Sequence, residues 1–471
     1  MEFSISQQDF VFEREGLLRD IYKIGNKIGE GAFSSVRRIK HRETLEKRAV
    51  KTVHKKKLRN ESERQMIFNE VSILSKLDHP NILKIYEFYQ DEKNYYIITE
   101  FCSGGELFEK IIRDGNLSEG LAASYMRQLL AVLVYLHDRH VVHRDIKPEN
   151  LVLSSSEPDS ILKVIDFGTA QAYTPGEKMH TRFGTPYYIA PEVLAQRYDE
   201  KCDMWSAGVN MYILLSGMPP FGGNSDHEIL NKVKTGRYSF PSPEWDSISF
   251  EAKDLIEKML TFDPERRISA REALAHPWLL NAARFRIDQA AARTALGNLK
   301  NFRTGQKLKK ATLAYIASQL ATKTEREEMV KLFESLDTDE NGTVSRDELR
   351  HGFELIFATE FEDIDEEINR IMNEVDINRS GEIDYNEFVT ACLNRQNLVS
   401  RKRLEAAFKA FDLDGSGTIT ADELKEILGK YHKHDDQFWR DMIREADLNG
   451  DGVIDLQEFV KMMLENNQVR F

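Results

Sequence analysis

Residues 142–150 carry the stretch Val142-His143-Arg144-Asp145-Ile146-Lys147-Pro148-Glu149-Asn150. Its polar residues follow the pattern H-R-D-x-K-x-x-N. A His-Arg-Asp triplet alone would be compatible with a polar surface turn, which is the simplest interpretation of any charged loop. A run with five fixed positions among nine residues is too specific for that alternative. The rest of the chain is therefore interpreted outward from this stretch.

This pattern is typical of the catalytic loop of protein kinases. The resemblance implies that Asp145 accepts or orients the substrate hydroxyl, and that Asn150 holds a metal ion on the nucleotide phosphates. It also implies that Lys147, which lies between them, neutralises charge on the γ-phosphate. Segments before the loop are then expected to position ATP, and segments after it to close and open the site.

A glycine-containing stretch begins at Ile28, between two segments of β type. Glycine lets a backbone close over phosphates, so we expect Gly29 and Gly31 to lie there. Val36 would cover the adenine, with Ile28 in the same nucleotide site. The stretch departs from G-x-G-x-x-G because Ser34 occupies the third glycine position, so by itself it is a weak indication.

Lys51 follows about twenty residues later, where the third strand of a kinase carries its phosphate-binding lysine. Ala49, two residues before it, is assigned to the adenine site on the same resemblance. Glu70 lies on the next helical pattern and is the candidate partner of Lys51. Either residue alone could be a solvated surface charge, but their order and spacing favour an ion pair. The apolar positions of that helix are Phe68, Val71, Leu74 and Leu77.

An apolar strand ending at Cys102 is expected to lead into a hinge whose backbone binds adenine. Thr99 would be the gatekeeper, and Glu100 and Cys102 the hinge residues. Glu106 follows in Gly-Gly-Glu-Leu-Phe. It could contact the ribose, contact a basic residue of the substrate or begin the next helix, and the sequence leaves these alternatives open.

Asp166-Phe167-Gly168 comes after another short apolar strand. In a kinase this aspartate binds the Mg²⁺ that bridges the phosphates, and Val152 is assigned to the nucleotide site on the same resemblance. Glu192, at the end of Gly-Thr-Pro-Tyr-Tyr-Ile-Ala-Pro-Glu, is expected to pair with Arg267 in a structural role.

Thr181 stands four residues before Thr185, in the segment where many kinases are phosphorylated. Arg144 could pair with a phosphate on it. An unmodified surface threonine is an equally good interpretation, because calcium-driven relatives often manage without this step.

Together these motifs make residues 22–280 resemble a eukaryotic protein kinase of the calcium/calmodulin-dependent group, with a bilobal α+β fold. The resemblance implies serine/threonine specificity, because Lys147 follows the catalytic aspartate. It implies activity, because all of the expected residues are present: Lys51, Glu70, Asp145, Asn150 and Asp166. It also implies a regulatory spine of Leu74, Ile85, His143 and Phe167.

The last third of the chain is an internal repeat of four twelve-residue segments, which start at Asp337, Asp376, Asp412 and Asp447. The starts are separated by 39, 36 and 35 residues. Each segment fits the EF-hand loop, with ligands at positions 1, 3, 5, 7 and 12 and a glycine at position 6 for the sharp turn. Four such matches predict calcium binding rather than purely structural loops.

The predicted ligands follow from these positions, with the backbone carbonyl acting at position 7. They are Asp337, Asp339, Asn341, Thr343 and Glu348; Asp376, Asn378, Ser380, Glu382 and Glu387; Asp412, Asp414, Ser416, Thr418 and Glu423; and Asp447, Asn449, Asp451, Val453 and Glu458. The second loop is the weakest, because Asn378 and Ser380 replace acids. Position 8 is apolar in each loop, as a β-bridge between paired loops needs.

Charge is distributed unevenly along the chain. Residues 323–471 hold 36 acidic and 19 basic side chains, a net charge of −17, against −13 for the whole chain. Residues 281–322 carry +7 and have helical apolar spacing through Phe285, Leu296, Leu308 and Leu320. A basic amphipathic helix resembles a calmodulin target, although a charged linker helix would have the same composition.

Composition restricts the remaining possibilities. A chain of 471 residues predicts two or three domains. The sequence contains no run of about 18 apolar residues, so it predicts no membrane-spanning helix. Three scattered cysteines favour a reducing, cytoplasmic setting over a disulfide framework. The acidic C-terminal third suits divalent cations or basic peptides and speaks against nucleic acid. Glu2 replaces the glycine that myristoylation requires. We expect a monomer.

A kinase, a basic junction and four EF-hands in one chain resemble the calcium-dependent protein kinases of plants and protists. We therefore expect an N-terminal extension (1–21), which either packs on the kinase or is disordered, a bilobal α+β kinase domain (22–280), autoinhibitory junction helices (281–322) and an all-α calmodulin-like domain (323–471). The resemblance implies ATP, Mg²⁺ and Ca²⁺ as cofactors, and protein substrates with a basic residue before the serine or threonine.

The expected mechanism has two states. At low calcium the junction lies on the kinase domain and inhibits it. With calcium, the EF-hand pairs open apolar grooves that take up the junction. Residues of these grooves are Phe333, Phe408, Phe411, Met442, Met462 and Met463. The rival hypotheses are a calcium-binding scaffold with a degenerate kinase domain, and a constitutive kinase with buffer loops.

Overall fold

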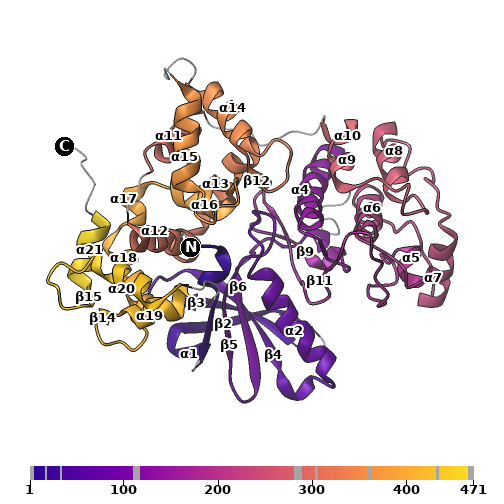
Figure 1. The fold of residues 1–471 in the computed structure, drawn as a ribbon. Helices are drawn as coiled ribbons and strands as arrows, with labels where there is room; N and C mark the ends of the chain where they lie inside the picture. Colours follow the sequence, from indigo (N-terminus) through magenta and orange to yellow (C-terminus); the bar gives the residue numbers. More distant parts are fainter. Residues whose placement is uncertain are drawn as a thin grey trace.

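The computed structural model of the chain describes residues 5–15, 18–31, 34–109, 117–280, 289–302, 306–357, 363–430 and 434–464. Two lobes of a kinase fold are followed by a helical region, which lies beside the hinge and the N-lobe sheet (Figure 1). In the same view α5 (Pro191–Leu194) and α7 (Asp226–Thr235) lie at the opposite side of the molecule. Among the described residues, none of the helices is long and apolar enough to cross a membrane.

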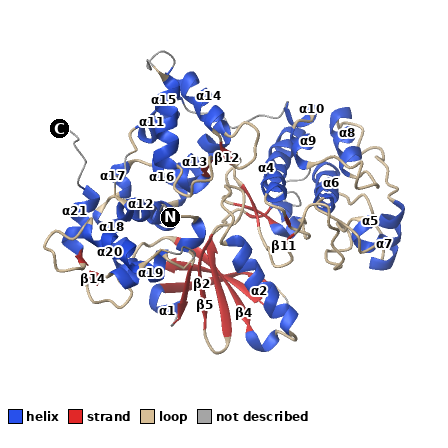
Figure 2. Cartoon of the chain, in the orientation of Figure 1, coloured by secondary structure: helices blue, strands red, loops and turns tan. Residues whose placement is uncertain are grey.

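The N-lobe is built on a six-stranded sheet in the order β1-β5-β6-β4-β3-β2 (Figure 2). All neighbours are antiparallel except β1, which is parallel to β5. Because β1 precedes residue 22, the N-terminal extension contributes a strand to this sheet. The strands are β1 (Phe12–Glu15), β2 (Tyr22–Glu30), β3 (Ser34–His41), β4 (Lys47–His54), β5 (Ile85–Gln90) and β6 (Asn94–Glu100).

Helix α2 (Glu61–Leu74) packs against β5 of this sheet. It begins at Asn60, whose side-chain oxygen accepts the backbone N–H of Glu63 at 2.9 Å, a standard N-cap. Ile67 and Leu74 are buried on its inner face together with Glu70. The helix therefore places one carboxylate inside the lobe, beside β4. Short helices of this lobe are α1 (Leu18–Ile21) and the 3₁₀ turn η2 (Lys55–Lys57).

The C-lobe is organised around α4 (Glu119–Asp138) and α6 (Lys201–Ser216). Every residue of α6 after Lys201 is buried, and the helix ends at Gly217 with a left-handed φ of +74°. Short strands between the helices carry the catalytic loops. The other elements are β7 (Gly105–Glu106), β8 (Val141–Val142), η3 (Pro148–Asn150), β9 (Leu151–Leu153), β10 (Leu162–Val164), β11 (Gln171–Ala172), α8 (Phe250–Met259), α9 (Ala270–Leu274) and α10 (Pro277–Leu280).

Four helix–loop–helix units form the C-terminal region, as its internal repeat predicts. Two-residue strands join the loops in pairs, β12 with β13 and β14 with β15. The units consist of α13 (Lys323–Leu336), β12 (Thr343–Val344) and α14 (Arg346–Phe357); α15 (Ile364–Val375), β13 (Ile383–Asp384) and α16 (Tyr385–Cys392); α18 (Arg401–Phe411), β14 (Thr418–Ile419) and α19 (Ala421–Leu428); and α20 (Asp436–Arg444), β15 (Ile454–Asp455) and α21 (Leu456–Leu464). Helix α17 (Arg395–Leu398) connects the two pairs.

The junction lies inside the core of this EF-hand region. Its described helices are α11 (Gln289–Lys300), α12 (Lys307–Tyr315) and the π-helical turn η4 (Ile316–Leu320). Their apolar side chains share one buried cluster with the EF-hands, separate from the kinase core. Phe285, which the sequence places in the basic helix, falls outside the described residues.

The N-terminal extension also reaches this core. Its 3₁₀ turn η1 (Gln7–Phe10) places the ring of Phe10 at 5.8 Å from that of Tyr315. Gln319 donates its side-chain amide to the carbonyl of Phe10 at 2.9 Å. One short segment therefore contacts both the kinase sheet, through β1, and the junction.

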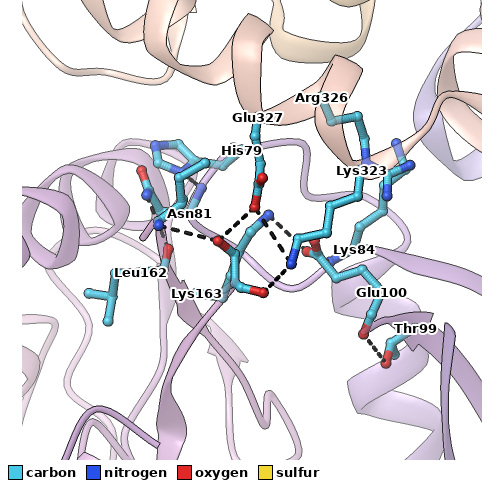
Figure 3. Close-up of polar contacts among 12 residues, drawn as sticks. His79, Asn81, Lys84, Thr99, Glu100, Leu162, Lys163, Lys323, Arg326 and Glu327 are labelled. Atoms are coloured by element: carbon cyan, nitrogen blue, oxygen red, sulfur yellow. Dashed lines mark hydrogen bonds and ion pairs between the residues drawn. The ribbon is translucent and has the colours of Figure 1, made fainter. Parts of the chain in front are cut away.

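Helix α13 forms a polar seam with the back of the hinge (Figure 3). Ser154 donates to Glu327 at 2.9 Å, and Lys323 donates to the carbonyl of Ser154. Lys84 of the kinase donates to Asn386 of α16 at 2.7 Å, and burial lowers the pKa of Lys84 to about 8. The EF-hand region thus contacts the kinase through charged groups that are buried away from water.

Candidate active site and calcium sites

A lysine and two acids meet between the lobes. Lys51 on β4 donates to both carboxylate oxygens of Glu70 on α2 at 2.8 Å. Its ammonium is also 3.7 Å from the Oδ1 atom of Asp166. The charge of Lys51 lowers the pKa of Asp166, whereas burial raises the pKa of Glu70 against the opposing effect of Lys51. The lysine is therefore held charged beside a metal-ligand candidate.

The catalytic loop forms a second polar cluster. Lys147 donates to the Oδ2 atom of Asp145 at 2.6 Å, and Asn150 donates to the Asp145 carbonyl at 2.8 Å. Thr185 of the activation segment donates to the other oxygen, Oδ1, at 3.3 Å. The structure brings all three loop residues together. The sequence does not indicate the contact with Thr185, because 40 residues separate it from Asp145.

Asp203 of α6 anchors the backbone of this loop. Its carboxylate accepts the backbone N–H of His143 at 2.9 Å and that of Arg144 at 2.8 Å. Arg144 has a left-handed φ of +69°, which these two bonds stabilise. The rings of His143 and Phe167 are 4.7 Å apart. The sequence marks Asp203 only as the start of a buried helix, so its anchoring role appears only in the structure.

The residues expected around adenine line the cleft edge. Gly29 pairs with Val36 across β2 and β3, Ile28 is exposed, and Gly31 donates its N–H to the carbonyl of Ser34 at 2.9 Å. Ala49 and Thr99 are partners across β4 and β6. Thr99 donates its hydroxyl to the Glu100 carbonyl at 3.3 Å.

The side chain of Glu100 faces away from this cleft. It accepts from Lys163 at 2.9 Å and belongs to the seam with α13 (Figure 3). A nucleotide contact of Glu100 would therefore use its backbone. Burial raises the pKa of the Cys102 thiol, so the neutral side chain adds no charge at the hinge.

Glu106 stands opposite Val152 in the β7–β9 pair. Its carboxylate is partly exposed, and its pKa is raised by burial and then by the neighbouring charges of Glu109 and Glu149. Two acids near one another attract a basic side chain. Glu106 is the last residue of its strand, and the chain is helical from Leu107, so the structure agrees with a helix start as well as with contact to a substrate.

Arg144 is already engaged by neutral groups. Its Nε donates to the Thr169 carbonyl at 2.6 Å, and its Nη1 donates to the Tyr198 hydroxyl at 3.2 Å. The Tyr198 hydroxyl in turn donates to the carbonyl of Thr181 at 2.6 Å. The activation segment is thus connected to Arg144 without a phosphate. Glu192 and Arg267 form the expected buried pair, at 2.5 Å.

The four EF-hand loops have one common internal geometry. In each, the N–H of the glycine at position 6 donates to the Oδ2 atom of the aspartate at position 1, at 2.9 Å. The glutamates at position 12 accept backbone N–H groups at the start of their loops: Glu348, Glu387, Glu423 and Glu458.

Two of the loops gather three carboxylates each. In the first loop, oxygens of Asp337, Asp339 and Glu348 lie within 4.8 Å of one another, and the third loop has an equivalent group. Burial raises the pKa of Asp337 well above its usual range, because an ionised carboxylate is costly in this place without a positive charge beside it. A buried oxygen of Asp412, Oδ1, has no hydrogen-bond partner. A divalent cation fits both loops, because its positive charge would compensate the negative charge of these carboxylates.

Comparisons with known proteins agree with this geometry. Residues 22–279 match the protein kinase domain, and residues 326–393 and 401–464 match the EF-hand domain pair. Calcium-dependent protein kinase 4 of Plasmodium berghei is 40% identical over 468 residues, which cover 97% of this chain and 88% of that protein. The chain belongs to the calcium-dependent protein kinase family.

Other relatives of the kinase lie in the same family. Calcium-dependent protein kinase 3 of Plasmodium berghei is 41% identical over 98% of this chain and 83% of its own length. Calcium-dependent protein kinase 9 of Arabidopsis thaliana is 38% identical over 95% and 82%, respectively. The kinase is therefore a calcium-activated serine/threonine protein kinase that uses ATP, Mg²⁺ and Ca²⁺ and acts on protein substrates.

Proposed function

We propose that calcium activates this kinase by moving the junction, residues 281–322, from the kinase domain to the EF-hands. The supporting observation is the burial of the junction in the EF-hand core. Leu296, Leu299 and Leu308 have no exposed surface and share a cluster with Phe333 and Phe411. In this proposal, burial of the junction in the EF-hand core is the feature of the released, active state. In this proposal residues 22–280 are the catalytic unit and residues 323–471 the calcium-binding unit.

Polar contacts hold the junction in the same place. Lys309 is 1% exposed and donates to the carbonyl of Met462 at 2.9 Å. Arg48 of β4 donates to the carbonyl of Gln319, in η4, at 2.7 Å. Without these carbonyls, Lys309 and Arg48 would each lose a buried hydrogen bond, which is costly. These contacts favour one defined position over a loosely attached linker.

At the active site, we assign the roles that the geometry supports best. Asp145 orients the substrate hydroxyl and accepts its proton. The positive charge of Lys147 neutralises negative charge on the transferred phosphoryl group. Asp166 and Asn150 would hold Mg²⁺, which neutralises the phosphates when it is bound. Lys51, fixed by Glu70, orients the nucleotide. The Lys51–Glu70 pair supports this assignment, because both partners are in bonding contact.

For substrates, we propose a preference for arginine three residues before the serine or threonine. Glu106 and Glu149 supply the opposite charge, and the raised pKa of Glu106 is consistent with an acidic neighbourhood. The acids would bind the guanidinium by charge-assisted hydrogen bonds.

The energy available from calcium is sufficient. Moving an equilibrium from 1:99 to 99:1 requires about 5.5 kcal/mol of differential binding. Tenfold tighter calcium binding in the active form contributes about 1.4 kcal/mol per site. Four sites together therefore match the requirement.

The test is phosphorylation of a peptide array by the full chain, with calcium and with a chelator. We expect incorporation into peptides with an upstream arginine, and only with calcium. Equal incorporation under both conditions would identify a constitutive kinase whose loops act as buffers. No incorporation under either condition would favour a scaffold with a degenerate kinase domain.

A further inference from the structure

The fourth position of the EF-hand loops is conformationally unusual. The backbone there is left-handed in all four loops, with φ of +55° at Glu340, +61° at Arg379, +71° at Gly415 and +78° at Gly450. Glycine adopts this conformation without steric cost, whereas a residue with a β-carbon does not. The third and fourth loops use glycine. The first and second loops instead have Glu340 and Arg379 there, so each of these side chains lies on a strained backbone.

The side chain of Glu340 contacts the kinase domain. Its Oε1 atom accepts from Nη1 of Arg127, on α4 of the C-lobe, at 2.5 Å. The side chain of Arg127 is only 12% exposed, and that of Glu340 only 15%. Nη2 of Arg127 donates to the carbonyl of Leu279, at 2.5 Å, which fixes the guanidinium against α10. An ion pair that is largely shielded from water loses less to screening than a surface pair.

The rest of the first loop lies close to the same surface. A β-carbon added to Gly342 would lie 2.5 Å from the ring of Tyr135 and 2.6 Å from that of His79. Arg271 of α9 pairs with the Oδ2 atom of Asp339 at 3.2 Å. The Oδ1 atom of Asp339 instead accepts the N–H of Asn341 within the loop. The loop thus contacts α4 and α9 with its backbone and with two carboxylates.

We infer that the first EF-hand loop is also the docking surface for the kinase C-lobe, with Glu340 as its docking side chain. Calcium binding orders the loop around the ion and fixes position 4, and therefore favours the Glu340–Arg127 contact. By thermodynamic reciprocity, docking on the C-lobe raises the calcium affinity of this loop by the same factor. The third and fourth loops do not share this coupling through position 4, because they have no side chain there.

This inference rests on the proposed calcium regulation and specifies which loop transmits it. The test variant is Glu340→Gly, because glycine relieves the left-handed strain. If Glu340 served only the loop itself, Glu340→Gly would bind calcium as well as the wild type or more tightly. If Glu340 docks the loop, the variant binds more weakly. Asp347→Asn is the matched control, since it removes a carboxylate from the same loop whose side chain is 92% exposed.

Calcium binding to the full chain is measured by titration calorimetry, and docking by hydrogen exchange of α4 and α9. We expect Glu340→Gly to weaken one site about fivefold, the lower end of typical coupling, and to increase exchange in α4 and α9 with calcium bound. Asp347→Asn should match the wild type. The charge exchange Glu340→Arg with Arg127→Glu should restore part of the affinity.

Unchanged calcium affinity and unchanged exchange in Glu340→Gly would overturn the inference, whether or not the exchanged pair folds. Failure of the proposed function would give a different result. Phosphorylation by the wild type would be independent of calcium, while the change in calcium affinity of Glu340→Gly could still be measured.

Discussion

At the scale of single residues, the candidate active site depends on side chains that hold one another in place. Asp145 accepts a hydrogen bond from Lys147 on one carboxylate oxygen and from Thr185 on the other. Lys51 lies between Glu70 and Asp166. Each group has a charged or hydrogen-bonding partner, so replacing one alters a small network and not an isolated contact.

Changing Asp145 to asparagine should remove nearly all phosphoryl transfer. The amide keeps the shape and the hydrogen bond to Thr185 but cannot accept the substrate proton, and general bases contribute about 10²–10⁴-fold. Asp166→Asn should have a similar effect because it weakens metal binding. Peptide phosphorylation and thermal unfolding of the same samples provide the measurement. Turnover close to that of the wild type in either variant would reject these roles.

Glu106 should make the preference for arginine dependent on pH. Its raised pKa means that it takes up a proton at a higher pH than an ordinary glutamate, whose pKa is about 4.3. The preference should therefore decrease as the pH falls toward that raised pKa, and stay constant above it. Glu106→Gln should reduce the preference by about fivefold, the upper range for a partly exposed pair, and remove this pH dependence. The ratio of kcat/KM for peptides with Arg and with Ala provides the measurement, and an unchanged ratio in Glu106→Gln would exclude the contact.

At the scale of elements, the junction helices are held by groups from three directions. Apolar side chains of α11 and α12 pack among the EF-hand helices. Lys309 contacts the end of α21, and η4 contacts β4 through Arg48. The strand that carries Lys51 therefore touches the last turn of the junction only three residues away from the lysine. This proximity connects the calcium-binding region to the ATP site by a short path.

Removing the bidentate ligands of the last two loops should raise the calcium concentration that activity requires. Glu423→Gln with Glu458→Gln keeps the capping contacts at both loops but loses one ligand charge in each. With fewer occupied sites the equilibrium shifts toward the inhibited state, in which the junction lies on the kinase domain. A calcium titration of peptide phosphorylation on both proteins measures the shift. Superimposable curves would separate the EF-hands from the regulation of the enzyme.

At the scale of the whole molecule, the described residues of the junction and the EF-hand region contact both lobes of the kinase. The junction meets the N-lobe sheet through Gln319 and Arg48, α13 meets the back of the hinge, and the first loop meets the C-lobe. The N-terminal extension adds a further link between β5 and the junction core. The calcium-binding region therefore touches both lobes, whose relative position sets the geometry of the cleft between them.

Deleting residues 281–471 should give a kinase whose activity does not respond to calcium. The deletion also removes one hydrogen-bond partner of Arg48, which is 5% exposed in the full chain, and the ring that packs on Phe10. We therefore expect a lower melting temperature and partial activity. Calcium titrations and thermal unfolding of the truncated and full chains are the measurements. A truncated protein that still responds to calcium would place the sensor elsewhere.

Much of this protein could be predicted from the sequence alone. The catalytic motifs, the four EF-hand loops and the basic junction depend on residues that are close together along the chain, and their spacing fixes local geometry. The glycine at position 6 of each loop, for example, has a left-handed φ and donates to the aspartate at position 1 in all four. Such features follow from short-range sterics and hydrogen bonding, which the sequence contains in full.

Only the tertiary structure decided how these parts meet. Glu340 and Arg127 are separated by 213 residues, and Arg48 and Gln319 by 271. Nothing local distinguishes either arginine from a solvated surface charge. Their partners are selected by the packing of whole domains, which buries a few charges and leaves others in water. The sequence determined the catalytic and calcium-binding chemistry, and the tertiary packing determined which residues connect the two.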